Sequence, residues 1–488
     1  MMEQILDREN LAQAWKRVKA NKGAPGIDGM TVDAFPAFCR EHWERISQAL
    51  MKGTYRPASV RRVWLPKPDG TMRPLGVPTV LDRLIQQAMA QVLGRLFEGD
   101  FSAHSYGFRP GRSAHQAVAE LELCWKARRR YAVDCDLKSF FDTVNHDHLM
   151  EALRKKVKCP RTLGLIRRYL TAGVVLPDGT RDATLQGVPQ GGPLSPLLAN
   201  IVLDPLDKEL EARGHRFARY ADDFIVMVKS ARAAQRVMAS LIRFCEGRLK
   251  LVVNRAKSQA APLQSCAFLG YQVGKRGKLM WTFEAVHRFK QRVRDITRRN
   301  RGHRVQDVIG ELRRYVIGWL NYFKLSHTYT VVLELDRWLR RRVRLYYWKQ
   351  WKQPRTRRRN LISLGIAPDR VKLASRSRKG YWRMSQNSIV RTALNNHWLN
   401  EQGVPDIRVT WINVALAALA PSGSLPAGCL AGARLTTGQV PASDRNRRIR
   451  TRMSGGVGPV AGLSQSRGPD SLPLLSRASD PRHSPIPS

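Results

Sequence analysis

The chain has 488 residues, 43% of them hydrophobic, and it carries 84 Lys and Arg against 39 Asp and Glu, a formal net charge of +45. A chain of this length and composition can bury a large core, which excludes a wholly disordered protein and predicts about two to four domains. So much positive charge causes self-repulsion unless a polyanion neutralises it, and we therefore predict a nucleic-acid partner. A ribosomal protein or a highly charged solvated surface is the alternative interpretation.

The cysteines and the apolar runs bear on the location of the protein. Seven cysteines without a C-x-x-C pair predict reduced thiols in a cytoplasm, with neither a disulfide framework nor a zinc knuckle. The first residues have scattered charges and lack the apolar segment of a signal peptide. Without a run of about 18 apolar residues we expect no transmembrane helix and no membrane partner. The expected location is cytoplasmic.

Along the chain, three regions differ in composition. Residues 1 to about 285 combine helical patterns, as at 80–96, with strand patterns, as at 130–137 and 224–228, which predicts an α+β fold. Residues 286–400 contain 29 Lys and Arg against 6 Asp and Glu, with apolar residues at helical spacing, which predicts a basic helical domain with an aromatic-rich core. After Trp411 the 77 remaining residues contain nine prolines and no Phe, Tyr or Trp, so we predict a disordered tail over 413–488.

Several basic and polar residues of the first region are candidate ligands of nucleotides. Arg61, Lys67 and Arg73 stand in a segment punctuated by Pro and Gly, where cations could clamp a triphosphate. Lys67 and Arg73 could instead be solvated turn charges. Arg109, in YGFRPGRS, could contact template phosphates or form a structural salt bridge. Gln190 precedes Gly191-Gly192-Pro193 and suits a polar contact where the backbone approaches a nucleotide or template closely; an ordinary loop before a helix is the alternative.

Two acidic segments carry the strongest chemical signal. In RYADDFIVMV, Asp222 and Asp223 stand side by side before an apolar strand pattern, and in VDCDLKSFFDTVNH, Asp136 follows another strand pattern. Two adjacent carboxylates repel each other unless a cation joins them, although an isolated Asp-Asp pair is often a solvated turn. If the strand at 133–137 lies beside a hairpin with its tip at 221–223, carboxylates from both could share two Mg²⁺ ions, with Mn²⁺ as a substitute. Because strand neighbours face opposite ways, we expect Asp222 to be the firmer ligand and Asp223 the more peripheral one.

Eight segments, in order along about residues 3–400, resemble those of the bacterial group II intron reverse transcriptases and maturases. They are RRVWLPKPDGTMRPLGVPTVLDRLIQQA, SYGFRPGRSAHQAV, VDCDLKSFFDTVNH, GVPQGGPLSPLLANI, RYADDFIVMV, LKLVVNRAKS, AFLGYQV and RWLRRRVRLYYWKQWKQPRTRRRNLISLGI. Beyond Cys266 the chain has only Cys429, so the resemblance is to the lineage without a zinc-containing endonuclease domain. The tail from about residue 413 resembles no module of this family.

The resemblance implies a right-hand polymerase followed by helical RNA-binding parts. The expected boundaries are an N-terminal extension and the start of the fingers over 1–60, fingers and palm over 61–285, a helical thumb and maturase domain over 286–412, and the tail over 413–488. It implies an RNA-directed DNA polymerase whose catalytic and metal-binding residues are Asp136, Asp222 and Asp223. Its expected partners are the intron RNA, an RNA template with a DNA primer, dNTPs and target DNA.

The resemblance also assigns roles to residues around these carboxylates. It implies nucleotide binding by Arg61, Lys67, Arg73, Phe141, Gln190 and Lys257. Phe141 matches a steric gate that excludes a ribose 2′-OH, although Phe140 or Phe141 could simply be core. Lys257 is similar to a lysine proposed as the acid that protonates pyrophosphate, and a surface lysine is the alternative. Asp142, Asn145 and His146 are expected to cap or brace the following helix.

The basic domain is expected to bind intron RNA and assist splicing. Arginines that bind phosphates are interleaved there with aromatic residues that stack on bases or, for most tryptophans, fill the core. The candidate RNA-binding residues are Arg340, Arg341, Arg342, Arg344, Lys349, Lys352, Arg355, Arg357, Arg358 and Arg359.

Two other functions stay open at this point. One is a splicing factor whose polymerase is vestigial, although the presence of all three aspartates argues against decay of the site. The other is a domesticated reverse transcriptase that serves phage defence. Intron RNA sequences flanking the gene would favour the intron-encoded, mobile protein over the second alternative.

Overall fold

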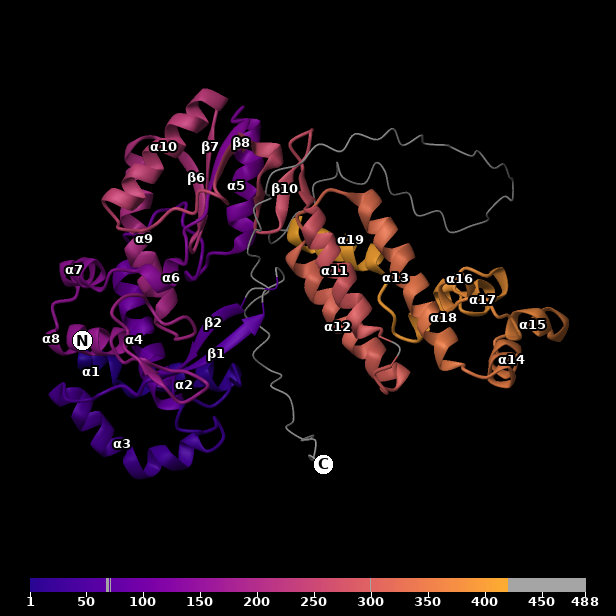
Figure 1. The fold of residues 1–488 in the computed structure, drawn as a ribbon, viewed down its shortest axis with the longest axis horizontal. Coiled ribbons are helices and arrows are strands. Elements are labelled where there is room, and N and C mark those ends of the chain that lie inside the picture. The colour runs from indigo at the N-terminus through magenta and orange to yellow at the C-terminus, as the bar shows by residue number, and fades with distance from the viewer. Residues whose placement is uncertain (67–69, 71, 299, 420–488) are drawn as a thin grey trace. The chain divides into compact units, whose positions relative to one another are not determined.

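The computed structural model describes residues 1–66, 70, 72–298 and 300–419. The chain divides into two compact units between Gly277 and Lys278, and each unit is described by itself. The predicted α+β fold is confirmed, and Figure 1 shows the elements in chain order.

The first unit contains ten α-helices, one short 3₁₀ helix (η1, Leu263–Ser265) and ten strands among its described residues. The helices are α1 (Met2–Ile5), α2 (Arg8–Ala20), α3 (Phe35–Lys52), α4 (Val80–Glu98), α5 (Ala114–Lys126), α6 (Phe140–Thr143), α7 (His146–Lys156), α8 (Pro160–Leu170), α9 (Ser195–Ala212) and α10 (Ala231–Gly247). The strands are β1 (Val60–Pro66), β2 (Met72–Val77), β3 (Tyr131–Cys135), β4 (Val174–Val175), β5 (Arg181–Asp182), β6 (Arg216–Tyr220), β7 (Asp223–Val228), β8 (Gln259–Pro262), β9 (Ala267–Phe268) and β10 (Tyr271–Val273).

A four-stranded antiparallel sheet in the order β6-β7-β3-β8 carries the acidic segments. All five residues from Phe224 to Val228 are buried, because β7 is an inner strand with helices packed on the sheet. Helix α10 lies against β3 and β8, and α5 lies against β6 (Figure 1). This burial on both faces explains why the segment after the two aspartates is continuously apolar instead of alternating.

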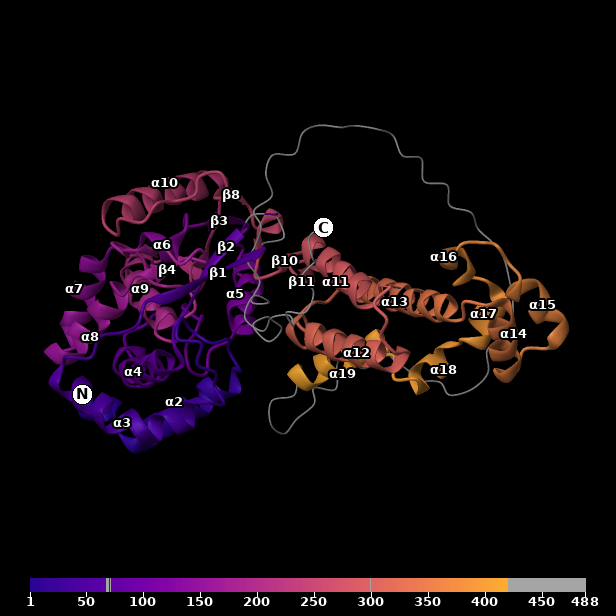
Figure 2. The ribbon, with the colours of Figure 1, turned by 60° about the horizontal axis from the view of Figure 1, so that its bottom comes forward.

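A second sheet, in the order β2-β1-β4-β5, is anchored to the helical layer by a buried carboxylate. Strands β1 and β2 form an antiparallel hairpin, with Arg61 opposite Val77. Just after β2, Asp82 of α4 is 1% exposed and accepts hydrogen bonds from the Tyr55 and Tyr169 hydroxyls at 2.8 and 3.1 Å. Helix α2 packs along α4 (Figure 2), and together these contacts fix the base of the hairpin.

The second unit is almost entirely helical among its described residues. Its elements are β11 (Leu279–Trp281), α11 (Phe283–Ile296), α12 (Val305–Tyr322), α13 (Tyr329–Gln350), α14 (Pro354–Ser363), α15 (Pro368–Ser375), α16 (Tyr381–Met384), α17 (Ser388–Ala393), α18 (Asn396–Glu401) and α19 (Ile407–Leu419). Helices α11, α12 and α13 lie side by side in both views (Figures 1 and 2).

Aromatic rings fill the core of the second unit. The Trp319 ring packs against Trp281, Phe289 and Phe323 with centroid separations of 4.7, 4.7 and 4.5 Å. Trp348 of α13 is fully buried. The predicted aromatic-rich helical core is therefore confirmed. Helix α19 continues to Leu419, beyond the boundary expected at residue 412.

Two expectations about cysteines and membranes concern the whole chain. The six cysteines within the described ranges are all free thiols, and Cys429 lies outside those ranges. Among the described helices, none combines the length and the apolar character needed to cross a membrane.

Candidate active site and nucleic-acid interface

The predicted neighbouring placement of the two acidic segments is confirmed. Strand β3 pairs with β7 so that Cys135 stands opposite Phe224. The next residue of each segment, towards the hairpin turn, is an aspartate: Asp136 follows Cys135, and Asp223 precedes Phe224. The β6–β7 hairpin turns at Ala221 and Asp222, and Ala221 has a φ of +58°. All three aspartates are half-buried. Two acidic strand ends therefore meet at one edge of the sheet.

Asp136 is fixed by the loop between α10 and β8, which contains the LKLVVNRAKS segment. Asn254 donates from its side-chain Nδ2 to Asp136 Oδ2 at 2.9 Å and from its backbone N–H to the Asp136 carbonyl at 2.8 Å. The Asp136 backbone N–H donates to Ser258 Oγ at 3.0 Å. A neutral amide thus orients this carboxylate without neutralising its charge. Sequence reasoning assigned no role to Asn254 or Ser258.

Arg219, two residues before the hairpin turn, is fully buried and joins three parts of the unit. Its guanidinium group donates to Asp207 and Asn200 of α9, with an Nη1–Oδ1 distance of 2.9 Å to Asn200. It also donates to Ser105 Oγ at 2.8 Å and to the carbonyl oxygen of Ala221 in the turn at 3.0 Å. Burial raises the pKa of Asp207, and the Arg219 charge opposes that effect. Sequence reasoning missed Arg219, although its place beside the acidic pair was a usable signal.

Gly107 lets the SYGFRP segment approach the hairpin turn closely. A Cβ atom at this position would lie 2.4 Å from the backbone nitrogen of Ala221, which no side chain tolerates. Asn200 Nδ2 donates to the Gly107 carbonyl at 2.8 Å. Of the two interpretations of Arg109, the structure supports the structural salt bridge. The Arg109 side chain is buried, and its Nη2 donates to Glu98 Oε1 at 2.8 Å.

Two of the predicted nucleotide-binding residues meet across separate segments. Arg73 of β2 donates from Nε to Gln190 Oε1 at 2.9 Å. The Gly76 N–H donates to the Gln190 carbonyl at 2.7 Å, and a Cβ on Gly191 would lie 2.3 Å from the Gly76 carbonyl oxygen. The loop before α9 therefore lies directly on the β1–β2 hairpin, and its glycine is required by that approach.

Phe141 lies in α6, close to the same loop. The Val188 N–H donates to the Phe141 carbonyl at 2.6 Å, and the Phe141 ring is 9% exposed and packs edge-on against Phe140 at 5.1 Å. Asn145 caps α7 by accepting from the backbone N–H groups of Asp147 and His148, as predicted for this segment. His146 is buried and bonds to the Gly187 carbonyl at 2.7 Å, so it braces the loop.

The remaining predicted nucleotide ligands lie in the same unit. Arg61 is half-buried on β1, and its Nε has no hydrogen-bond partner among the residues that the structure describes. Lys257 is half-buried in the loop that holds Asp136. Lys67 lies outside the described residues.

The three aspartates offer donors suited to a hard divalent cation. Within the described ranges, no three His, Cys, Asp or Glu side chains stand together as a ready-made metal cluster. Mg²⁺ prefers oxygen ligands and is often held by only one or two carboxylates, with substrate phosphates completing its coordination. Half-buried carboxylates at the ends of paired strands, one of them oriented by a neutral amide, fit such an ion.

Three of the predicted RNA-binding arginines are occupied inside the second unit. Arg340 is 2% exposed and pairs with Asp336 and Asp406 at 2.8 and 2.7 Å. Arg344 donates to the Leu394 carbonyl and Asn396 Oδ1, and burial lowers its pKa to about 10. Arg357 donates to the Trp351 carbonyl and stacks on the Trp348 ring. These guanidinium groups hold helices together instead of facing solvent.

The other predicted RNA-binding residues remain accessible to solvent. The half-buried ones are Arg341, Arg342 and Lys349, and the exposed ones are Lys352, Arg355, Arg358 and Arg359.

Comparison with known proteins identifies both units. Residues 65–273 match the family model described as Reverse transcriptase (RNA-dependent DNA polymerase). Residues 286–364 match the model described as Group II intron, maturase-specific domain.

Two curated proteins each match more than half of the chain. Protein YkfC of Escherichia coli (strain K12) is 34% identical over 314 residues, which cover 56% of this chain and 82% of YkfC. Group II intron-encoded protein LtrA of Lactococcus lactis subsp. cremoris is 31% identical over 329 residues, which cover 54% of each protein, so the chain spans about half the length of LtrA. Among solved structures, apo telomerase from Candida tropicalis covers 46% of this chain and 55% of its own at 16% identity, with a TM-score of 0.37 that is too low to support an argument. The chain belongs to the family of group II intron reverse transcriptases and maturases, which are RNA-directed DNA polymerases.

Proposed function

We propose that Asp136, Asp222 and Asp223 form the catalytic centre at which this chain adds dNTPs to a DNA primer on an RNA template. The observation that carries the proposal is the pairing of β3 with β7, which brings Asp136 to the hairpin that contains the other two aspartates. Two divalent cations, when bound by these carboxylates, would activate the primer 3′-hydroxyl and stabilise the charge of the leaving pyrophosphate.

The surrounding residues would bind and orient the incoming nucleotide. Arg73 and Gln190 are coupled by a hydrogen bond, so the β1–β2 hairpin and the loop before α9 would present one polar surface to the triphosphate and template. Phe141, at the rim of the core, would exclude a ribose 2′-OH. Lys257, in the loop that holds Asp136, would donate a proton to pyrophosphate, and Arg61 and Lys67 would supply further positive charge.

In the second unit, we propose that exposed cations on α14 and beside it bind the phosphates of the intron RNA. This binding would assist splicing, and together with reverse transcription into target DNA it would support mobility of the intron. Support comes from the net positive charge of this region, from the match of residues 286–364 to the maturase-specific domain, and from the solvent exposure of Arg355, Arg358 and Arg359.

The catalytic proposal is tested with Asp222→Asn, which keeps the side-chain shape and removes a negative ligand. Primer extension should fall by several orders of magnitude, since each ~1.4 kcal/mol of barrier corresponds to about tenfold in rate. The matched control is Asp33→Asn, an exposed aspartate of the same unit, which should extend primers normally. Extension by Asp222→Asn at close to the wild-type rate would show that the ligand assignment is wrong.

The RNA-binding proposal has its own test. Replacing Arg355, Arg358 and Arg359 with Ala should weaken intron RNA binding and reduce the slope of log affinity against log salt by about 2 to 3, because about 0.7–0.9 counterions are released per phosphate contact. Extension of a short generic primer and template should be retained. An unchanged salt slope would remove these arginines from the interface.

A further inference from the structure

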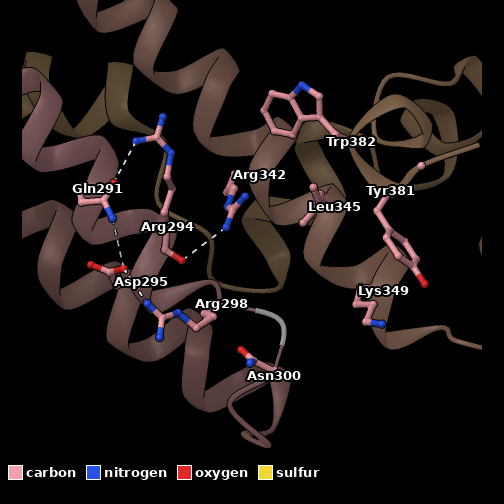
Figure 3. Close-up of a pocket in the computed structure, with 11 residues that line it drawn as sticks. Gln291, Arg294, Asp295, Arg298, Asn300, Arg342, Leu345, Lys349, Tyr381 and Trp382 are labelled. Atoms are coloured by element: carbon pink, nitrogen blue, oxygen red, sulfur yellow. Dashed lines mark hydrogen bonds and ion pairs between the residues drawn. The ribbon is translucent and has the colours of Figure 1, made fainter.

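A basic, aromatic-lined pocket lies in the second unit between α11, α13 and α16. Its volume is about 1090 Å³. Figure 3 shows the residues around it: Arg294 of α11, Arg298 just after that helix, Arg342 and Lys349 of α13, and Trp382 of α16. This volume matches the upper end of small-molecule sites in proteins, which are clefts or cavities of roughly 300–1,000 Å³. It is therefore large enough for a nucleotide.

Positive charge predominates in the pocket. Asp295 is the one acidic residue among those that line it, and its ion pair with Arg298, at 3.5 Å, is between side chains that are 38% and 65% exposed, where such pairs contribute little. Arg294 Nη1 donates to the neutral Gln291 Oε1 at 3.3 Å, and Arg342 Nε donates to Thr297 Oγ1 at 2.8 Å. With four cations against one carboxylate, the residues that line the pocket suit an anionic ligand.

Two aromatic residues form the opposite side of the pocket. The Lys349 ammonium lies 5.1 Å from the centre of the Tyr381 ring, and Figure 3 shows the two side chains facing each other. The Trp382 indole is 39% exposed although the Arg341 guanidinium stacks on it at 3.6 Å. Large rings held in place by cations and partly open to water form a platform for stacking a base.

We propose that this pocket binds one unstacked nucleotide of a single-stranded RNA segment. The base would lie against Tyr381 and Trp382, while the adjoining phosphates meet Arg294 and Arg298. Duplex RNA keeps its bases stacked inside and displays its phosphates on a convex surface, so it cannot insert a base into a concave site. The inference rests on the proposed binding of intron RNA and deepens it, because it names the RNA structure that this part of the unit recognises.

The test compares a short labelled single-stranded RNA with the same strand in a duplex. Replacing Tyr381 and Trp382 with Ala should weaken single-strand binding by roughly 5- to 150-fold, from about 1–3 kcal/mol per stacked base, and should leave duplex affinity and the salt slope unchanged. Replacing Arg294 and Arg298 with Gln should instead reduce the single-strand salt slope by about 1.4, at about 0.7 per phosphate.

The matched control changes Arg370 and Lys372 of α15, two exposed cations of the same unit outside the pocket, to Gln. This control should leave the preference for single strands intact. Equal losses from the pocket and control variants, or equal losses for single strands and duplex, would overturn the proposal.

A measurement on the wild-type protein tests the proposal even if the variants misfold. Cross-linking of wild-type protein to RNA containing 4-thiouridine should give modified peptides that include Tyr381 or Trp382, and cross-links confined to other segments would refute the pocket. If the wild type binds intron RNA no better than unrelated RNA, the proposed function fails. If the wild type binds intron RNA selectively but the variant without Tyr381 and Trp382 binds single-stranded RNA as tightly as the wild type does, only the proposal about the pocket fails.

Discussion

Replacement of Arg219 should separate its effect on the position of the β6–β7 turn, which carries the proposed catalytic Asp222, from its effect on the stability of the fold. Arg219→Met would leave the fully buried Asp207 without its partner, which costs about 3–5 kcal/mol of the ~5–15 kcal/mol that stabilises a typical domain. That variant would report mainly unfolding. Arg219→Lys is the sharper change, because it keeps a cation beside Asp207 but, with its single terminal nitrogen, cannot reach Asn200, Ser105 and the Ala221 carbonyl together.

The expected result for Arg219→Lys follows from the lost support of the turn. If the turn that carries Asp222 shifts by about 1 Å, the rate should fall by about 10²-fold. We expect kcat for primer extension to fall by roughly 10- to 100-fold, with the KM for dNTP and the intron RNA affinity little changed. Steady-state extension over a dNTP series, a thermal melt and RNA affinity measure these quantities.

The matched control is Arg340→Lys in the second unit. Arg340 is also buried and pairs with two carboxylates, Asp336 and Asp406, so the substitution removes the same donors from a comparable setting. Both variants should lower the melting temperature, but only Arg219→Lys should lower kcat in the folded protein. Equal losses of kcat, or an Arg219→Lys enzyme with normal kcat, would refute the argument that this arginine positions the hairpin.

Three further predictions concern the nucleotide site and the end of the chain. Phe141→Ala should admit ribonucleotides in single-nucleotide extension, and an unchanged preference between dNTP and rNTP would assign the ring to the core. Arg73→Ala should lower kcat/KM for dNTP by about 10- to 150-fold, from about 1.5–3 kcal/mol for a bond to a charged group. In a double-mutant cycle with Gln190→Ala the two effects should be less than additive because the side chains are bonded, and strict additivity would contradict that coupling. Removal of residues 420–488, which contain no Phe, Tyr or Trp, should leave the thermal melt and primer extension unchanged, whereas loss of folding would show that the segment contributes to the core.

Much of the sheet edge that carries the aspartates could be predicted from the sequence because it depends on local patterns. An apolar run after Asp222 and Asp223 indicates a buried strand, and the turn before it puts these carboxylates at a strand end. A second run that ends just before Asp136 predicts the partner strand, and the structure pairs them as β3 and β7. The cap at Asn145 is equally local, since its side chain bonds to N–H groups two and three residues later.

The environment of each charge required the tertiary structure. Arg340, Arg344 and Arg357 look like their exposed neighbours in the sequence, but helix packing buries all three. Arg340 and Arg344 meet a carboxylate and a carbonyl from distant segments, and Arg357 stacks on the Trp348 ring. The same is true of Arg109: its sequence context fits a template contact as well as a structural salt bridge, and only the folded chain shows the ion pair with Glu98.

What the sequence by itself determined was the class of protein, its α+β and helical regions, and the aspartates at the ends of the paired strands, because strand periodicity, turn chemistry and net charge act over short distances. The tertiary structure alone decided which cations are occupied and which face solvent, and how Arg219, Asn254 and Gly107 support the sheet edge that carries the aspartates. These properties depend on contacts between residues far apart in the chain: the Asn254 amide meets Asp136 across 118 positions. A pattern of residue types does not encode such a contact until packing has brought the two segments together.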